Sequence, residues 1–302
     1  MASTDTTSAW PEITLAPWEG TREAMHLWSQ VVGKVRLALE PRVNHWWNVT
    51  LYVTARGLTT SLMPYGAAGV EMAFDFRDHV LTIDRTDRRS ATVALAPRSV
   101  ADFYAETMAR LAELDVHVDI LARPVEVPEA IPFADDDVHA SYDADAAHRF
   151  WLVLVQAQRV LSRFRSGFIG KASPVHFFWG GFDLAVTRFS GRRAPLHPGG
   201  VPNCADWVMY DAYSHEVSSA GYWPSGADEG IFYSYAYPEP DGYPAAPGGP
   251  GAYDDGLREF VLPYAAVREA ADPDATLLDF LESSYTAAAD LGAWDRAALE
   301  RR

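Results

Sequence analysis

The stretch SPVHFFWGGFDLAVTRFSG, residues 173–191, is the part of the sequence that decides the fold. It is rich in aromatic and β-branched residues, which favour a strand, and it carries two adjacent glycines near its centre. Glycines inside a strand are typical of a bulge, which would reset the alternation of side chains between the two faces. We therefore expect one long strand here, with a bulge at Gly180-Gly181. The earlier stretch NHWWNVTLYVTARGLTT, residues 44–60, has the same character and predicts another strand.

The elements around these two stretches recur in the same order. An amphipathic helix over residues 21–39 precedes the first stretch, and a helix that carries Trp151 precedes the second. A closing helix follows each group of strands, one beginning at Ser99 and one over residues 274–291. Further strands are expected at residues 70–84, 90–96, 207–219 and 231–237. Caps are expected from Ser99 and Asp102 in one closing helix and from Thr276 and Asp279 in the other.

Individual residues also match between the two groups of elements. The matched pairs are Trp28 with Trp151, His45 with His176, Asp75 with Asp211, His79 with His215, and Asp102 with Asp279. The separation within a pair only grows along the chain, as a duplicated unit with insertions in its second copy would produce. The sequence therefore predicts an α+β protein of two related halves, each consisting of helix, mostly antiparallel sheet and helix, with the second half enlarged.

The boundaries of the two halves follow from composition. The first half is expected at residues 10–123, an acidic linker at 124–145, and the second half at 146–295. An insertion rich in Pro, Gly and Ala at residues 240–256 has neither strand nor helix character. We expect it to be a mobile surface loop, with a lid over a site as the alternative.

Composition limits the classes of function. The 302 residues are 48% hydrophobic and 22% charged, which is typical of a folded protein, and 25 basic against 41 acidic side chains give a net charge of −16. A strongly negative field argues against nucleic acid and membrane surfaces as partners. The single cysteine, Cys204, excludes an internal disulfide and a multi-thiolate metal site. The start of the sequence lacks a basic leader with an apolar core, and we expect a cytoplasmic protein.

Residues 171–223 hold most of the side chains that could perform chemistry. The expected catalytic residues are His176, Asp183, His215 and Glu216. The expected binding residues are Lys171, Trp179, Arg188, Tyr213 and Trp223, with Trp46 from the first half. In a hydrolytic reaction, a histidine would be the general base, a carboxylate would orient it, and a cation would stabilise negative charge. His45 alternates with apolar residues, so we expect it to be a core histidine.

Established catalytic and cofactor motifs are missing. No HExxH or HxH spacing occurs, so no metal is predicted, although His176, His215 and a carboxylate could in principle form a site. No GxSxG, GxGxxG or GxxxxGK[ST] motif occurs, so no cofactor is predicted. The dipeptides Gly33-Lys34 and Gly170-Lys171 are too short to indicate a phosphate-binding loop.

The two stretches quoted above, together with DAYSHEVSSAGYWP (residues 211–224) and FYSYAYP (residues 232–238), resemble an uncharacterised bacterial family known only as a domain of unknown function. The resemblance covers residues 10–300. It implies a bacterial cytosolic protein, and it implies no activity, substrate or cofactor.

Two functions from different classes remain. The first is a small-molecule-binding protein with its site in the second half, in which acid–base chemistry would make it a hydrolase-like enzyme. The second is a non-catalytic interaction protein or homo-oligomer whose aromatic strands pack against a partner.

Overall fold

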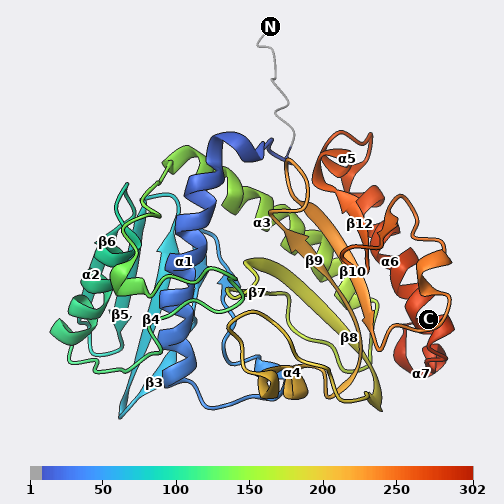
Figure 1. The fold of residues 1–302 in the computed structure, drawn as a ribbon, viewed down its shortest axis with the longest axis horizontal. Helices are drawn as coiled ribbons and strands as arrows, with labels where there is room; N and C mark the ends of the chain where they lie inside the picture. Colours follow the sequence, from blue (N-terminus) through green and yellow to red (C-terminus); the bar gives the residue numbers. More distant parts are fainter. Residues whose placement is uncertain (1–8, 302) are drawn as a thin grey trace, which may run out of the picture.

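The computed structural model describes residues 9–301 and confirms the α+β fold with two related halves (Figure 1). Each half begins with a long helix, continues into a six-stranded antiparallel sheet and ends with helix. The first half consists of α1 (Leu15–Leu39), η1 (Asn44–Trp46), β1 (Tyr52–Val53), β2 (Gly57–Thr59), β3 (Met63–Tyr65), β4 (Ala68–Asp75), β5 (Val80–Arg85), β6 (Ser90–Ala94) and α2 (Val100–Glu113).

The second half follows a connection that contains the short helix η2 (Phe133–Asp135). It begins with α3 (Ala144–Ser166), β7 (His176–Phe178), β8 (Asp183–Arg193), α4 (Asp206–Ala212), β9 (His215–Trp223) and β10 (Ile231–Tyr237). It ends with η3 (Tyr243–Ala245), β11 (Ala252–Asp254), β12 (Glu259–Pro263), α5 (Tyr264–Arg268), α6 (Pro273–Leu291) and α7 (Arg296–Leu299). The elements α4, η3 and β11 enlarge this half relative to the first.

Both sheets run mostly as meanders from their first strands, where they meet, but in the second sheet β12 lies between β10 and β11. The strand order is β1-β2-β4-β5-β6 in the first sheet, with β3 beside β4, and β7-β8-β9-β10-β12-β11 in the second. Leu51 and Phe177 exchange both backbone hydrogen bonds, at 2.9 and 2.7 Å, and thereby join the two sheets edge to edge. The two halves are therefore in direct backbone contact at the centre of the molecule.

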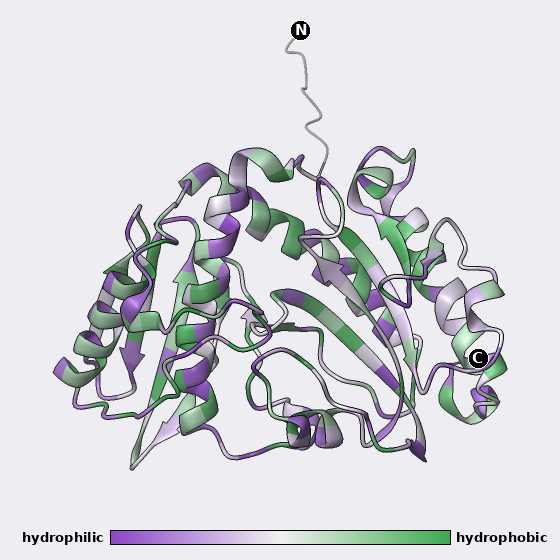
Figure 2. Cartoon of the chain, in the orientation of Figure 1, coloured by the Kyte–Doolittle hydropathy of each residue, from purple (hydrophilic) through white to green (hydrophobic). Residues whose placement is uncertain are grey.

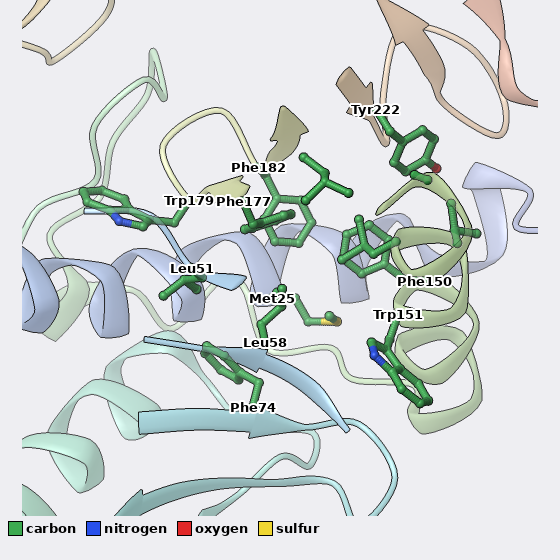
Figure 3. Packing of buried hydrophobic residues seen from close by; sticks show 14 of the residues in the cluster. Met25, Leu51, Leu58, Phe74, Phe150, Trp151, Phe177, Trp179, Phe182 and Tyr222 are labelled. Atoms are coloured by element: carbon green, nitrogen blue, oxygen red, sulfur yellow. The ribbon is translucent and has the colours of Figure 1, made fainter. Parts of the chain in front are cut away.

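One hydrophobic core runs through both halves. Trp28 of α1 stacks on Phe103 of α2 with ring centroids 4.7 Å apart, while Phe150 of α3 stacks on Phe182 at 5.2 Å. Figure 3 shows side chains from α1, from the first sheet and from α3 converging on Phe177 at the junction. Hydrophobic segments lie along the strands of both sheets (Figure 2).

Several expected strands have different boundaries. Residues 173–191 form the hairpin β7–β8 instead of one bulged strand, because Gly180-Gly181 makes the turn and Phe178 pairs with Asp183. Residues 44–60 form η1 and two short strands, and residues 70–84 form β4, a turn and β5. The expected strand at residues 207–219 is wrong in its first part, because residues 206–212 form α4.

One predicted cap is confirmed and the other is wrong. Ser99 accepts a hydrogen bond from the backbone N–H of Asp102 at 3.0 Å, as expected. The last long helix begins earlier than expected, at Pro273, with Asp272 as its N-cap instead of Thr276. Proline suits the first position of a helix because its missing N–H would have no partner there.

The matched residue pairs agree only partly with the structure. Trp28 and Trp151 lie on the opening helices of their halves, and Asp102 and Asp279 lie on α2 and α6. The other pairs fail, because their members lie in different elements. Asp75 ends β4 whereas Asp211 lies in α4, His79 lies in a turn whereas His215 begins β9, and His45 lies in η1 whereas His176 begins β7.

The inserted segment at residues 240–256 is packed and ordered into short elements. Tyr243 of η3 is fully buried, and its ring meets Phe260 edge-on at 5.0 Å. Strand β11 pairs with β12 at the edge of the second sheet. The segment lies at the surface, as expected for an inserted loop, but aromatic side chains anchor it to the sheet.

Candidate functional site

A cavity of about 820 Å³ lies between the two halves, with one face of the second sheet as its floor. Alternate residues of a strand point to the same face, and those of β8, β9 and β10 that face the cavity are Asp183, Ala185, Thr187, Phe189, Val217, Ser219, Trp223, Tyr233 and Tyr235. The walls come from the end of α1, from η1, from residues 119–126 and from residues 201–213. The opposite face of the sheet packs against α3 and α6. The volume is in the range of sites that hold drug-sized molecules.

Three carboxylates gather at one end of the cavity. The Tyr233 hydroxyl donates a hydrogen bond to Oδ2 of Asp183. Oδ1 of Asp183 and Oε2 of Glu126 lie 2.9 and 3.6 Å from the point where a Cβ on Gly181 would stand, so the two groups are neighbours. Within residues 9–301, the side chains of Glu126 and Glu259 form neither a hydrogen bond nor an ion pair, although both line the cavity.

The surroundings shift the pKa of all three groups upward. Removal from water raises the pKa of Asp183 to about 6, and the hydrogen bond from Tyr233 opposes this shift. Removal from water, together with repulsion from Asp183, raises the pKa of Glu126 and of Glu259 to about 7. Glu126 keeps some contact with solvent through the cavity, although protein surrounds most of its carboxyl group. These carboxyls can therefore exchange protons near neutral pH.

Glu126 is held in place from both halves. The side chain of Gln30 on α1 accepts from Val125 N–H at 2.8 Å and donates to the Val125 carbonyl at 2.9 Å. The Glu126 N–H donates to the Pro202 carbonyl at 2.8 Å. Its carboxylate lies over the β7–β8 turn, where a Cβ on Gly180 would collide with Oε1. Gly180 is thus needed to leave room for the carboxylate, which explains why the turn carries two glycines.

Lys34 lies in the cavity wall without a partner. Its side chain is buried, with 4% exposure, and Nζ lies 5.6 Å from the centroid of the Trp179 ring. In the described part of the chain it forms no hydrogen bond and no ion pair. Burial lowers the pKa of Lys34 to about 8, while the nearby Cys204 thiol opposes the shift.

A second group of polar residues lies at the other end, around His45. Its Nδ1 is 3.1 Å from the carbonyl oxygens of Asp211 and Ala212, and its Nε2 is 2.8 Å from Nζ of Lys171. Carbonyls only accept, so Nδ1 carries the proton and Nε2 accepts from Lys171. Burial, and secondarily the charge of Lys171, lowers the pKa of His45. His45 is buried as expected, but its ring also lines the cavity.

Some of the residues that line the cavity have an unfavourable backbone conformation. His45, Trp46, Glu126 and Asn203 all have positive φ angles, between 52° and 60°, and all line the cavity. The left-handed conformation is unfavourable for side chains other than glycine and recurs at functional sites. The shape of the cavity walls therefore depends on these local backbone conformations as well as on the packing of helices and strands.

The structure brings together half of the residues expected to form a site. Those that line the cavity are Asp183, Trp179, Tyr213, Trp223 and Trp46. Lys171 and His215 lie beside the cavity, both close to His45, and the rings of His45 and His215 are 5.7 Å apart.

His176, Arg188 and Glu216 lie elsewhere. His176 is fully buried with Nδ1 at 3.1 Å from Oγ1 of Thr50, and burial lowers its pKa to about 3. Arg188 points to the helix side of the sheet, where it donates to the Phe164 carbonyl and pairs with Glu282 at 3.3 Å. Glu216 accepts from Ser190 and from Arg192. None of the three lines the cavity.

Sequence reasoning missed several polar residues that line the cavity. They are Lys34, Glu126, Glu259, Tyr233 and Tyr235. The tyrosines had a detectable signal, because their spacing of two in IFYSYAY places them on one face of a strand. Glu126 lay in a stretch with the composition of a linker, and Lys34 lay in a helix with no local motif.

Two features are absent from the described part of the chain. Across residues 9–301, no group of three or more His, Cys, Asp or Glu side chains is arranged to hold a metal ion. In the same residues, no helix combines the length and the apolar composition needed to cross a bilayer.

Comparison with known proteins gives a family without an activity. The chain belongs to the family of unknown function DUF5996, whose sequence profile matches residues 10–301, and the resemblance noted above is thereby confirmed. Neither the search of curated proteins nor the search of solved structures gave a match.

Proposed function

We propose that this protein binds a small organic molecule in the cavity between its two halves. The observation that carries the proposal is the cavity itself, about 820 Å³ in volume, with polar side chains that have no partner among residues 9–301. A concave, mostly apolar space with a few convergent polar groups is the usual form of a ligand site.

The walls support a ligand with an apolar or aromatic body. Trp46, Trp47, Trp179 and Trp223 all contribute ring surface, and large rings contribute strongly to the binding of apolar groups. Apolar side chains are also exposed at the rim of the cavity, namely Leu37, Leu121, Trp207 and Leu257, together with the carboxylates of Asp119 and Glu126. An apolar molecule therefore meets apolar surface from the rim to the interior.

A catalytic version of this proposal would use Asp183 and Glu126. Their raised pKa values, about 6 and about 7, allow one carboxyl to hold a proton while the other is ionised at neutral pH. Such a pair can act as general acid and general base. These residues replace the buried His176 in the role expected from the sequence.

The second candidate is an interaction protein, and the apolar rim is the observation that favours it. A partner segment or a second copy of the chain could cover these exposed side chains. Measurement of the solution mass across a range of concentrations separates the two candidates, since a strict monomer counts against a self-associating protein.

Three expectations from the sequence remain proposals. The similar run of antiparallel strands outward from the centre in each sheet, and the central Leu51–Phe177 bridge, support an origin of the halves by duplication. A cytoplasmic location and a bacterial source remain predictions from composition and resemblance.

Titration with the neutral dye Nile red tests the proposed site. We expect a saturable rise in fluorescence with one dye per chain, because the cavity is apolar and large enough. Ala185→Trp, which fills the cavity from its floor, should weaken binding at least tenfold. Ala112→Trp, at an exposed position on α2, is the matched control and should bind as the parent does. Absence of saturable binding, or full binding by Ala185→Trp, would contradict the proposal.

A further inference from the structure

We infer that the ligand is a zwitterion with an apolar body, whose ammonium group binds Glu126, Asp183 and Glu259 and whose carboxylate binds Lys34. The inference rests on the proposed function and names the chemical class of molecule that the same cavity takes.

The acidic end lacks a cation. Three carboxylates arrive from separate elements: Asp183 from β8, Glu259 from β12, and Glu126 from the segment before the second half. The hydroxyl of Tyr233 satisfies one oxygen of Asp183, and the side chains of Glu126 and Glu259 have no partner among residues 9–301. Carboxylates placed together in a partly desolvated space repel one another. A bound ammonium would remove the repulsion and donate up to three hydrogen bonds.

Lys34 supplies the second and independent observation. Lys34 is a buried residue, with 4% exposure, that lines the cavity, and no carboxylate of the described chain pairs with its ammonium. Burial of an unpaired charge is unfavourable unless a partner of opposite sign compensates it. The ligand is therefore the missing partner, and a carboxylate is the group that fits an ammonium.

The two ends are close enough for one small molecule. The Lys34 ammonium lies over the Trp179 ring, and the Glu126 carboxylate lies over the adjacent residue, Gly180. The thiol of Cys204 interacts electrostatically with both Lys34 and Glu126, so it lies near each. Opposite charges thus stand along one wall without forming an ion pair. A molecule with both charges would bridge them, whereas a simple amine would leave Lys34 unpaired.

The aromatic residues beside these charges would hold the body of the ligand. The rings of Trp179 and Tyr233 stand next to the two charged ends, and Trp223 packs against the same small apolar cluster as Tyr233. A ring or short alkyl chain would pack here, and the ammonium could also rest against a ring face.

Two sets of probes test the inference by isothermal titration calorimetry at pH 7.5 and low salt. In the first, phenylalanine is compared with phenethylamine and 3-phenylpropionate, which each keep one of its charges. In the second, 4-(aminomethyl)benzoate, whose charges are farther apart, is compared with 4-methylbenzylamine and 4-methylbenzoate. We expect at least one zwitterion to bind ten or more times tighter than both of its singly charged analogues.

Substitutions assign each charge to its residues. Lys34→Met should abolish the advantage of the zwitterion over the amine, and Glu126→Gln should reduce its advantage over the carboxylate. Lys171→Met is the matched control, because Lys171 is the other lysine of the chain and contacts His45 at the opposite end. Thermal unfolding of each variant establishes that the fold is intact.

The outcomes separate this inference from the proposal on which it rests. If Nile red binds but no zwitterion exceeds its analogues, or if the preference persists in Lys34→Met, the inference is overturned and the cavity remains a ligand site. If neither the dye nor any probe binds, the proposed function itself is wrong.

Discussion

The two sheets are both antiparallel and six-stranded, but they use their faces differently. In the first sheet, residues that point toward the helices, such as Ile83 and Val93, are buried, while their neighbour Thr92 is exposed. In the second sheet, β8, β9 and β10 have few exposed positions on either face, because α3 and α6 cover one face and the cavity lies on the other.

This difference shows where function can be located in such a fold. An antiparallel sheet needs only one packed face for stability, so the other can face water. The first sheet presents small polar residues there. The second presents Asp183, Trp223 and Tyr233, and segments from both halves enclose them. The candidate site therefore lies on the face of the second sheet that does not pack against the helices.

The largest expected effect comes from the helix side of the second sheet. Arg188→Ala should lower the free energy of unfolding by about 3 kcal/mol, because it removes a buried side chain and leaves a void. Its guanidinium carbon lies 3.4 Å from the centroid of the Phe164 ring, and no solvent can fill its place readily. The adjacent Thr187→Ala, on the cavity side, should lose about 1 kcal/mol or less, since it breaks one hydrogen bond to Ser219. Urea unfolding measures both, and equal losses would contradict the assignment of the two faces.

A smaller effect is expected when an aspartate in each half is replaced by asparagine. The free energy of unfolding should change in opposite directions for Asp183 in the second half and Asp75 in the first. The pKa of Asp183 is raised in the folded state, so the folded protein binds more protons than the unfolded chain between about pH 4 and pH 6. Stability therefore falls as the pH rises through this range. Asp183→Asn should raise the free energy of unfolding by about 1–2 kcal/mol at pH 8 and leave it unchanged at pH 3.

Asp75 in the first half is the matched control. Burial alone would raise its pKa, but hydrogen bonds from the Asp78 backbone and from Arg56 lower it overall. Its charged form therefore stabilises the fold above the pKa of the unfolded chain, and this stability is lost as the pH falls. Asp75→Asn should destabilise the protein at pH 8. Thermal unfolding at both pH values checks the pair, and the same sign for both variants would contradict the account.

The smallest effect is expected on the open face of the first sheet. Thr92→Lys should change the free energy of unfolding by less than about 0.5 kcal/mol, because the side chain is in water. The same change at Thr187 places a long charged side chain in the cavity and should abolish binding of Nile red. Dye binding that survives Thr187→Lys would show that the second face is not the binding surface.

Local sequence patterns correctly predicted helices and strands that bury one face and expose the other. The stripe of Trp28, Val31, Val32 and Val35 on α1 is fully buried, as its helical spacing indicated. The same pattern gave no signal for Lys34. Residues 29–36 are all buried, because Trp179 of the β7–β8 turn and the segment around Val125 cover the other side of α1. Such burial depends on contacts far along the chain, which periodicity cannot report.

The missed parts of the site share this cause. Glu126 lies in an acidic stretch that reads as a linker, and it is positioned by Gln30, which is 95 residues from Val125 in sequence. The helix α4 has only seven residues, and its aromatic composition favoured a strand. Its neighbour Trp46 donates to the Val208 carbonyl at 3.0 Å, a tertiary contact with no local signal. Composition and spacing therefore gave the architecture, while the cavity formed from segments that only the fold brings together.

The bridge between Leu51 and Phe177 has a mechanical consequence. In the described part of the chain, this mutual pair of hydrogen bonds is the backbone link from one sheet to the other. Two bonds so close together resist sliding of one sheet edge past the other, and the core that runs through both halves holds the angle between the sheets. Because Lys34 comes from the first half and Asp183 from the second, a molecule held by both would add one more connection between the halves.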